Sequence, residues 1–125
     1  MKLFITKASK IKDLQEKFTA VYPFLKIEFY THPHEKNQLS VRKDRISPQK
    51  VISKIGRYSK ADQINIDGNR TVAEVEHEFY EKFGIAMQVS RRTRNVWIET
   101  SLTDNRTLEM QNKQGEESSI SLADM

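Results

Sequence analysis

The chain has no cysteine, and only three prolines, four glycines and one tryptophan are spread over its 125 residues. Without cysteine there is neither a disulfide framework nor a thiolate metal ligand. The glycines stand alone, which excludes a glycine-rich phosphate loop, and no Gly-x-Ser-x-Gly elbow for a nucleophile is present. We therefore expect no cofactor and classify the protein as non-catalytic.

Long apolar runs are missing as well. The N-terminus has one short apolar stretch, Leu3 to Ile5, and then lysines, which is not the core of a signal peptide. Nothing further along is long enough to span a bilayer. With 125 residues, the chain has the size of a single domain. We expect a cytoplasmic protein with no membrane partner.

Part of the chain repeats itself. Each half has apolar residues at helical spacing, followed by apolar residues that alternate as in a strand. The first half contributes Ile11, Leu14, Phe18, Tyr22 and then Leu25, Ile27, Phe29; the second contributes Val72, Val75, Phe79, Phe83 and then Ile85, Met87, Val89. Two helix-then-strand units of one design predict a pseudo-symmetric core.

The same periodicities place the other elements. Helices are predicted over 9–22 and 71–83, the second with a capping box at Thr71 and Glu74. Strands are predicted over 2–6, 25–31, 63–67, 85–91 and 95–101, the last two as a hairpin. The order indicates an α+β fold of the ferredoxin-like split β-α-β type, a pseudo-repeat with a helical insert and an added C-terminal strand. An unrelated α+β roll with the same order of elements is the alternative.

Two segments interrupt this plan. Residues 32–60 are predicted to be a basic insert, with a mobile surface loop over 32–47 and a helix from Ser47 to Gly56. After a single domain over 1–101, residues 102–125 are predicted to form a short helix over 107–113 and a disordered acidic tail from Gly115.

Charge is segregated along the chain. Residues 36–60 hold eight Lys or Arg against the single Asp44, although the net charge of the whole chain is only +4. This density predicts phosphate contacts and a nucleic-acid-binding accessory protein as one reading, whereas a solubilising surface explains it more simply. The residues of this reading are Arg42, Lys43, Arg45, Lys50, Lys54, Arg57, Arg91, Arg92 and Arg94.

Trp97 is the candidate for a protein contact. Alternation places Val96 and Ile98 on one side of their strand and Trp97 on the other, where an open sheet face would expose it beside Phe4 and Tyr30. A C-terminal segment that folds back through Leu108 and Met110 would instead cover the ring.

Two further clusters are weaker. His32 and His34 point the same way on an extended chain and are the candidate metal ligands, but a polar loop explains them better. The helix predicted over 71–83 is acidic through Glu74, Glu76, Glu78 and Glu81, and a solvated helix face near a positive helix end accounts for Glu74 and Glu76.

Several segments resemble a group of small uncharacterised bacterial proteins. They are Lys2 to Thr6, Thr71 to Glu76, Phe83 to Ile85, Asn95 to Thr100, Thr107 to Glu109, and Gln111 with Asn112. The resemblance implies a bacterial cytoplasmic origin and no catalytic activity.

The leading hypothesis is therefore a non-catalytic binding module that acts through protein–protein contacts, with a homodimer as one form. The nucleic-acid reading is the alternative.

Overall fold

The computed structural model describes residues 1–33, 39–40 and 42–119, and it confirms the α+β class. Five strands and three α-helices follow one another along the chain in an order close to the predicted one. They are β1 (Lys2–Ile5), α1 (Ile11–Val21), β2 (Leu25–Tyr30), β3 (Asp62–Asn65), α2 (Val72–Phe83), β4 (Ala86–Thr93), β5 (Val96–Glu99) and α3 (Leu108–Ser119).

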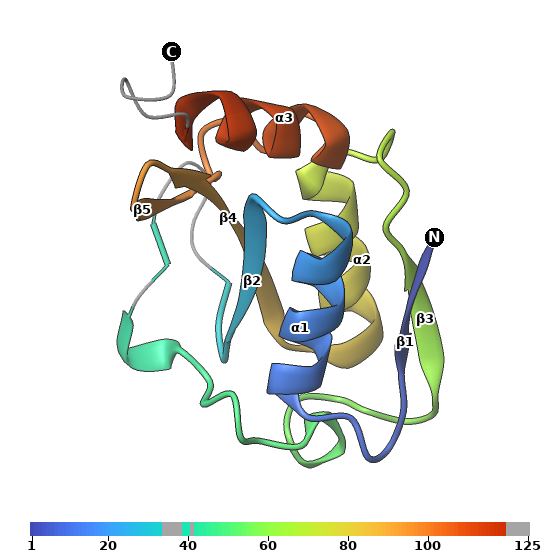
Figure 1. The fold of residues 1–125 in the computed structure, drawn as a ribbon. Coiled ribbons are helices and arrows are strands. Elements are labelled where there is room, and N and C mark those ends of the chain that lie inside the picture. Colours follow the sequence, from blue (N-terminus) through green and yellow to red (C-terminus); the bar gives the residue numbers. More distant parts are fainter. Residues whose placement is uncertain (34–38, 41, 120–125) are drawn as a thin grey trace.

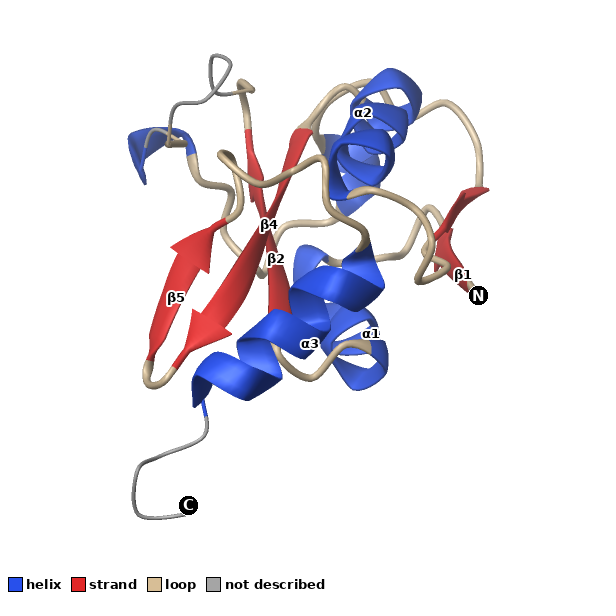
Figure 2. Ribbon diagram, turned by 90° about the horizontal axis from the view of Figure 1, so that it is seen from above, coloured by secondary structure: helices blue, strands red, loops and turns tan. Residues whose placement is uncertain are grey.

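The strands form two antiparallel sheets with helices between them. β1 pairs with β3 in a two-stranded ribbon, and β2, β4 and β5 form a second sheet in the order β2-β4-β5. Helices α1 and α2 lie between the ribbon and the larger sheet, and α3 packs on β4 (Figures 1 and 2). The predicted hairpin is present as β4 and β5, with Arg94 at φ 57° in its two-residue turn.

The predicted ferredoxin-like arrangement is not confirmed. That arrangement has one sheet in which the first and third strands separate the second from the fourth. Here β2 pairs directly with β4 over six residues, and β1 pairs with β3 in a separate sheet. Alternating residues predict that a segment is a strand with one buried face, but they do not specify its neighbour.

Each strand of the internal repeat pairs with its counterpart in the other half. β1 pairs with its own counterpart β3, and β2 pairs with its counterpart β4. Leu3 lies opposite Ile64, and Glu28 lies opposite Gln88, at the same offsets in sequence that relate the two apolar patterns. A two-fold axis that passes through the β1–β3 pair and the β2–β4 pair would exchange the two halves of the repeat. Such an axis pairs each strand with its equivalent in antiparallel orientation.

The core lies between the two β layers. The apolar stripes of α1 and α2 are fully buried, and Phe29 of β2 meets Phe79 of α2 with ring centroids 4.9 Å apart. The predicted capping box starts α2: Glu74 N–H donates to Thr71 Oγ1 at 3.1 Å and Thr71 N–H donates to Glu74 Oε1 at 3.2 Å. Gly84 ends α2 in the left-handed conformation with φ +70°.

The helix predicted from Ser47 to Gly56 was wrong. Within residues 47–56 one short 3-10 turn forms, Ile52–Lys54, and another, Arg42–Asp44, precedes the segment. The carbonyls of Pro48 and Lys50 accept from the N–H groups of Lys12 and Ile11 at 2.9 and 3.0 Å. The segment thus supplies acceptors for the unpaired amides at the start of α1 and cannot use the same carbonyls in a helix of its own.

The C-terminal helix was predicted too short. α3 continues past Lys113 and Gly115 to Ser119, and residues 120–125 lie outside the described ranges. Gln111 is completely buried, and its side-chain amide donates to Thr103 O at 2.7 Å and accepts from Arg91 Nη1 at 2.8 Å. The sequence of α3 has few apolar residues at helical spacing, so its packing on the sheet could not be predicted from an apolar stripe. A polar residue, Gln111, holds the helix in place instead.

Candidate interaction surface

The three predicted contact residues do not form one surface. Trp97 and Tyr30 lie on the same face of the larger sheet, whereas Phe4 lies on β1 of the separate ribbon. Tyr30 is buried, and its pKa is raised to about 12 by burial first and then by the charges of Glu28 and Glu99. Of the three, Trp97 and Phe4 remain as exposed aromatic side chains.

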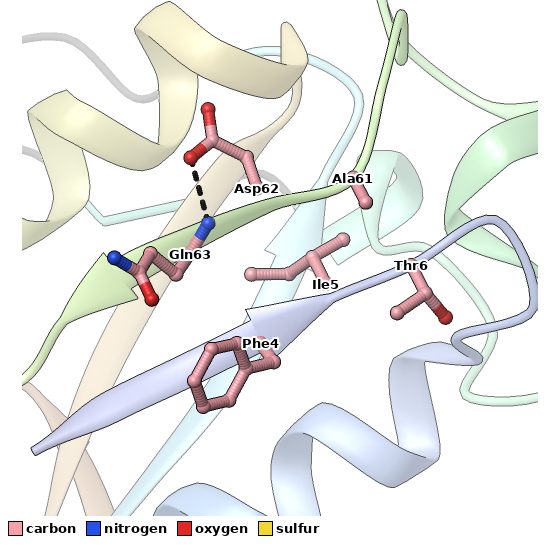
Figure 3. Close-up of a pocket in the computed structure, with 6 residues that line it drawn as sticks. All are labelled: Phe4, Ile5, Thr6, Ala61, Asp62 and Gln63. Carbon is pink, nitrogen blue, oxygen red and sulfur yellow. Dashed lines mark hydrogen bonds between the residues drawn. The ribbon is translucent and has the colours of Figure 1, made fainter.

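Phe4 borders a shallow hollow at the end of the ribbon. Figure 3 shows residues that line it between the ends of β1 and β3, among them Thr6, Ala61 and Asp62. The volume of the hollow is about 330 Å³. Asp62 is held by Gln63 N–H, which donates to Oδ1 at 2.7 Å, and by Lys82 Nζ at 3.3 Å. Both contacts go to the same oxygen, Oδ1, of the Asp62 carboxylate.

Strand β5 concentrates exposed apolar surface. Val96 is 60% exposed, Trp97 37% and Ile98 45%, although the three are consecutive and so face both sides of the sheet. Helix α3 packs on the face of Arg91, opposite to Trp97, so the fold-back predicted as an alternative does not cover the ring. Lys26 Nζ lies 5.0 Å from the centre of the Trp97 ring, a cation–π contact on that open side.

The outer edge of β2 is closed by specific hydrogen bonds. Thr19 Oγ1 and Gln15 Nε2 of α1 donate to the carbonyls of Leu25 and Ile27 at 3.0 and 2.9 Å. Toward the end of β2, residues of the insert bond to the same edge. Ile46 N–H donates to Phe29 O at 2.7 Å, and Thr31 N–H donates to Asp44 O at 2.9 Å. Proteins commonly cover sheet edges in this way, because an open row of N–H and C=O groups templates another strand.

The edge of β5 is open by comparison. Thr100 N–H donates to Val89 O, so the backbone of Thr100 bonds toward β4. Because the bonding direction alternates along an antiparallel strand, the backbone groups of Val96 and Ile98 also bond toward β4, whereas those of Trp97 and Glu99 point outward. Among residues 1–33, 39–40 and 42–119, no group bonds to the backbone of Trp97 or Glu99 on that outer side. The Glu99 side chain does accept from Ser40 N–H at 2.9 Å.

A buried carboxyl lies where β5 leaves β4. Val89 N–H, which would bond the next residue of β5, donates instead to Glu76 Oε2 of α2 at 2.9 Å. Although part of the Glu76 side chain reaches the surface, its carboxyl is enclosed by protein. Burial raises the pKa of Glu76 to about 8, the Val89 bond opposes this, and the charges of Asp104 and Glu99 add to it.

The prediction of a solvated Glu76 was therefore wrong. Glu76 follows the buried Val72 by four residues and precedes Phe79 by three, so the helical spacing itself places it at the border of the apolar stripe. Gln88 Oε1 and Ser101 Oγ are also buried, with no partner in the part of the chain that the structure describes. Sequence reasoning missed both.

The basic residues predicted for nucleic acid are spread over several surfaces, and some are engaged. Arg45 pairs with Glu28 at 3.0 Å, and Arg57 Nη2 donates to Tyr80 O at 2.9 Å. Arg91 donates to Gln111 and Gln114 of α3. Five side chains are exposed without a described salt bridge: Arg42, Lys43, Lys50, Lys54 and Arg94. Arg92, also exposed, donates from Nε to Arg94 O at 2.8 Å.

The histidine pair is only half visible. His32 is exposed, and its Nδ1 lies 3.8 Å from Oδ2 of Asp44. His34 lies outside the described residues. Within the described ranges, no three His, Asp or Glu side chains gather as metal ligands would. In the same ranges, no helix has both the length and the apolar character needed to cross a membrane.

Comparisons with protein-family models, with curated proteins and with solved structures found no match to this chain. The resemblance to small bacterial proteins stays a prediction. The feature that suggests a function is the exposed apolar surface of the edge strand β5.

Proposed function

We propose that this protein is a non-catalytic binding module that contacts protein partners, a second copy of itself included, through the β4–β5 hairpin. The supporting observation is the exposure of Val96, Trp97 and Ile98 on one short edge strand. Exposed tryptophan and isoleucine beside cationic side chains are typical of the centre of a protein interface. The other edge of the same sheet is closed by hydrogen bonds from α1 and the insert.

The proposal predicts that association depends on the hairpin. The double substitution Trp97→Ser with Ile98→Ser should weaken self-association at least about 100-fold, since burying two large apolar side chains contributes roughly 3 kcal/mol or more. Sedimentation equilibrium over a range of concentrations measures this directly. Phe4→Ser is the control, because Phe4 is an exposed aromatic on the other sheet (58%, against 37% for Trp97), and its loss should leave association unchanged.

A peptide library extends the test to other partners. Random extended peptides displayed on phage and selected on the wild-type protein should lose binding to the double variant and keep it on Phe4→Ser. A monomer at high concentration that also enriches no hairpin-dependent peptide would contradict the proposal.

The nucleic-acid alternative has its own measurement. A labelled oligonucleotide titrated at two salt concentrations should show no salt-sensitive binding if the basic residues serve solubility. Salt-sensitive binding that falls on substitution of Lys50 and Lys54 with glutamine, and not on the hairpin substitutions, would favour the alternative.

A further inference from the structure

We propose that two copies of this protein pair through β5 as antiparallel edge strands, joining their sheets into one of six strands, in the register that places Ile98 opposite Ile98. The inference rests on the proposed function and specifies the partner and its geometry. It requires that the edge be open, that the hydrogen bonds match, and that the charges of the two copies fit.

Hydrogen-bond geometry permits few registers. Only Trp97 and Glu99 direct backbone N–H and C=O groups outward from β5. In a symmetric antiparallel pair the bonding residues must face each other, so Trp97 can lie opposite Trp97, Trp97 opposite Glu99, or Glu99 opposite Glu99. A register with Trp97 opposite Ile98 is excluded, because the outward N–H and C=O groups of Trp97 would face a residue whose own N–H and C=O groups point toward β4.

Charge and length select among the three registers. Glu99 opposite Glu99 brings two carboxylates together, which is destabilising. Trp97 opposite Trp97 uses one bonding pair within β5 and brings together the two Lys26 ammonium groups that lie on the rings. Trp97 opposite Glu99 uses two bonding pairs, four backbone hydrogen bonds in all, within the bounds of the strand.

The selected register also fits the side chains. The carboxylate of Glu99 in the second copy comes beside the Trp97 ring, on which Lys26 Nζ lies at 5.0 Å, so opposite charges approach. On the other face Ile98 meets Ile98 at a non-hydrogen-bonded position, where Cα atoms are about 4.5 Å apart and side chains are closest. Two half-exposed isoleucines thereby leave water together.

A chain without cysteine allows a clean test of this register. Single substitutions Ile98→Cys, Val96→Cys and Trp97→Cys each introduce the only thiol of the protein. In the proposed dimer two thiols at Ile98 face each other within disulfide distance. Two thiols at Val96 are separated by four residues, about 13 Å along the strands, too far for a bond. Val96 is a matched control, because it shares the strand, the face and the exposure of Ile98.

We expect mild oxidation to convert Ile98→Cys to a covalent dimer and to leave Val96→Cys and Trp97→Cys monomeric on a non-reducing gel. Near-identical melting temperatures under reducing conditions would show that all three variants fold. Faster cross-linking of Trp97→Cys or Val96→Cys would overturn the register. No cross-link at Ile98 at concentrations where the wild type is dimeric would overturn the edge pairing. A monomeric wild type that still binds hairpin-dependent peptides would overturn this inference and leave the proposed function standing.

Discussion

Replacing Glu76 with glutamine should stabilise the protein above neutral pH and reduce its dependence on pH. The pKa of this carboxyl is raised from 4.5 to about 8 in the fold, so between these values the folded protein holds a proton that the unfolded chain has lost. The free energy of unfolding therefore falls as pH rises from about 4.5 to 8 and then levels off. Since each pKa unit corresponds to about 1.4 kcal/mol, the rise of the pKa from 4.5 to about 8 makes this loss on the order of 5 kcal/mol.

Glutamine keeps the acceptor for Val89 N–H and carries no charge at any pH. Urea unfolding at intervals from pH 5 to 9 should show the variant and the wild type converging at the acid end and diverging by roughly 4 kcal/mol at pH 8. Glu81→Gln, on the same helix with 63% of its side chain exposed, should follow the wild type at every pH. If Glu76→Gln follows the wild type as well, the carboxyl is ionised in the fold and our description of its surroundings is wrong.

The second large effect is expected at Gly56. Its φ is +64°, and an added Cβ would lie 2.2 Å from Phe83 O and 2.7 Å from Ile85 Cγ2. Gly56→Ala should cost roughly 3 to 4 kcal/mol, because the left-handed conformation contributes about 1 to 2 kcal/mol and the clash with a fixed carbonyl adds to it. Urea unfolding measures the loss.

Gly84→Ala separates these two causes. Gly84 has nearly the same φ, +70°, but an added Cβ meets the side chain of Arg57, at 2.5 Å from Nε, and no fixed backbone atom within that distance. The exposed Arg57 side chain can move away, so this variant should lose only about 1 to 2 kcal/mol. Equal losses in the two variants would mean that Phe83 O can move, and that conformation alone determines the cost.

The local elements could be predicted because short-range patterns determine them. Periodicity identified α1 and α2, and the capping box gave the start of α2 to the residue. The predictions failed for two segments whose structure depends on hydrogen bonds to other parts of the chain. The carbonyls of Pro48 and Lys50 serve α1, so no helix forms around them, and α3 is held by the buried Gln111 rather than by an apolar stripe.

The surface residues show the same division. Trp97 was expected either on an open sheet face or under a folded-back C-terminal segment, and it is 37% exposed, because α3 packs on the opposite face. Phe4 and Tyr30 were placed beside it on the assumption of a single sheet. The separate ribbon takes Phe4 away, and Tyr30 is buried.

By itself, the sequence determined the α+β class, the two repeated units and the residues of their core, since these follow from apolar spacing within each segment. Only the tertiary structure decided which strands pair, that Glu76 takes the place of a strand partner at Val89, and that the edge of β2 is closed while no group among residues 1–33, 39–40 and 42–119 bonds to the outer edge of β5. These outcomes depend on hydrogen bonds between residues far apart in the chain. A pattern confined to one segment carries no information about such partners.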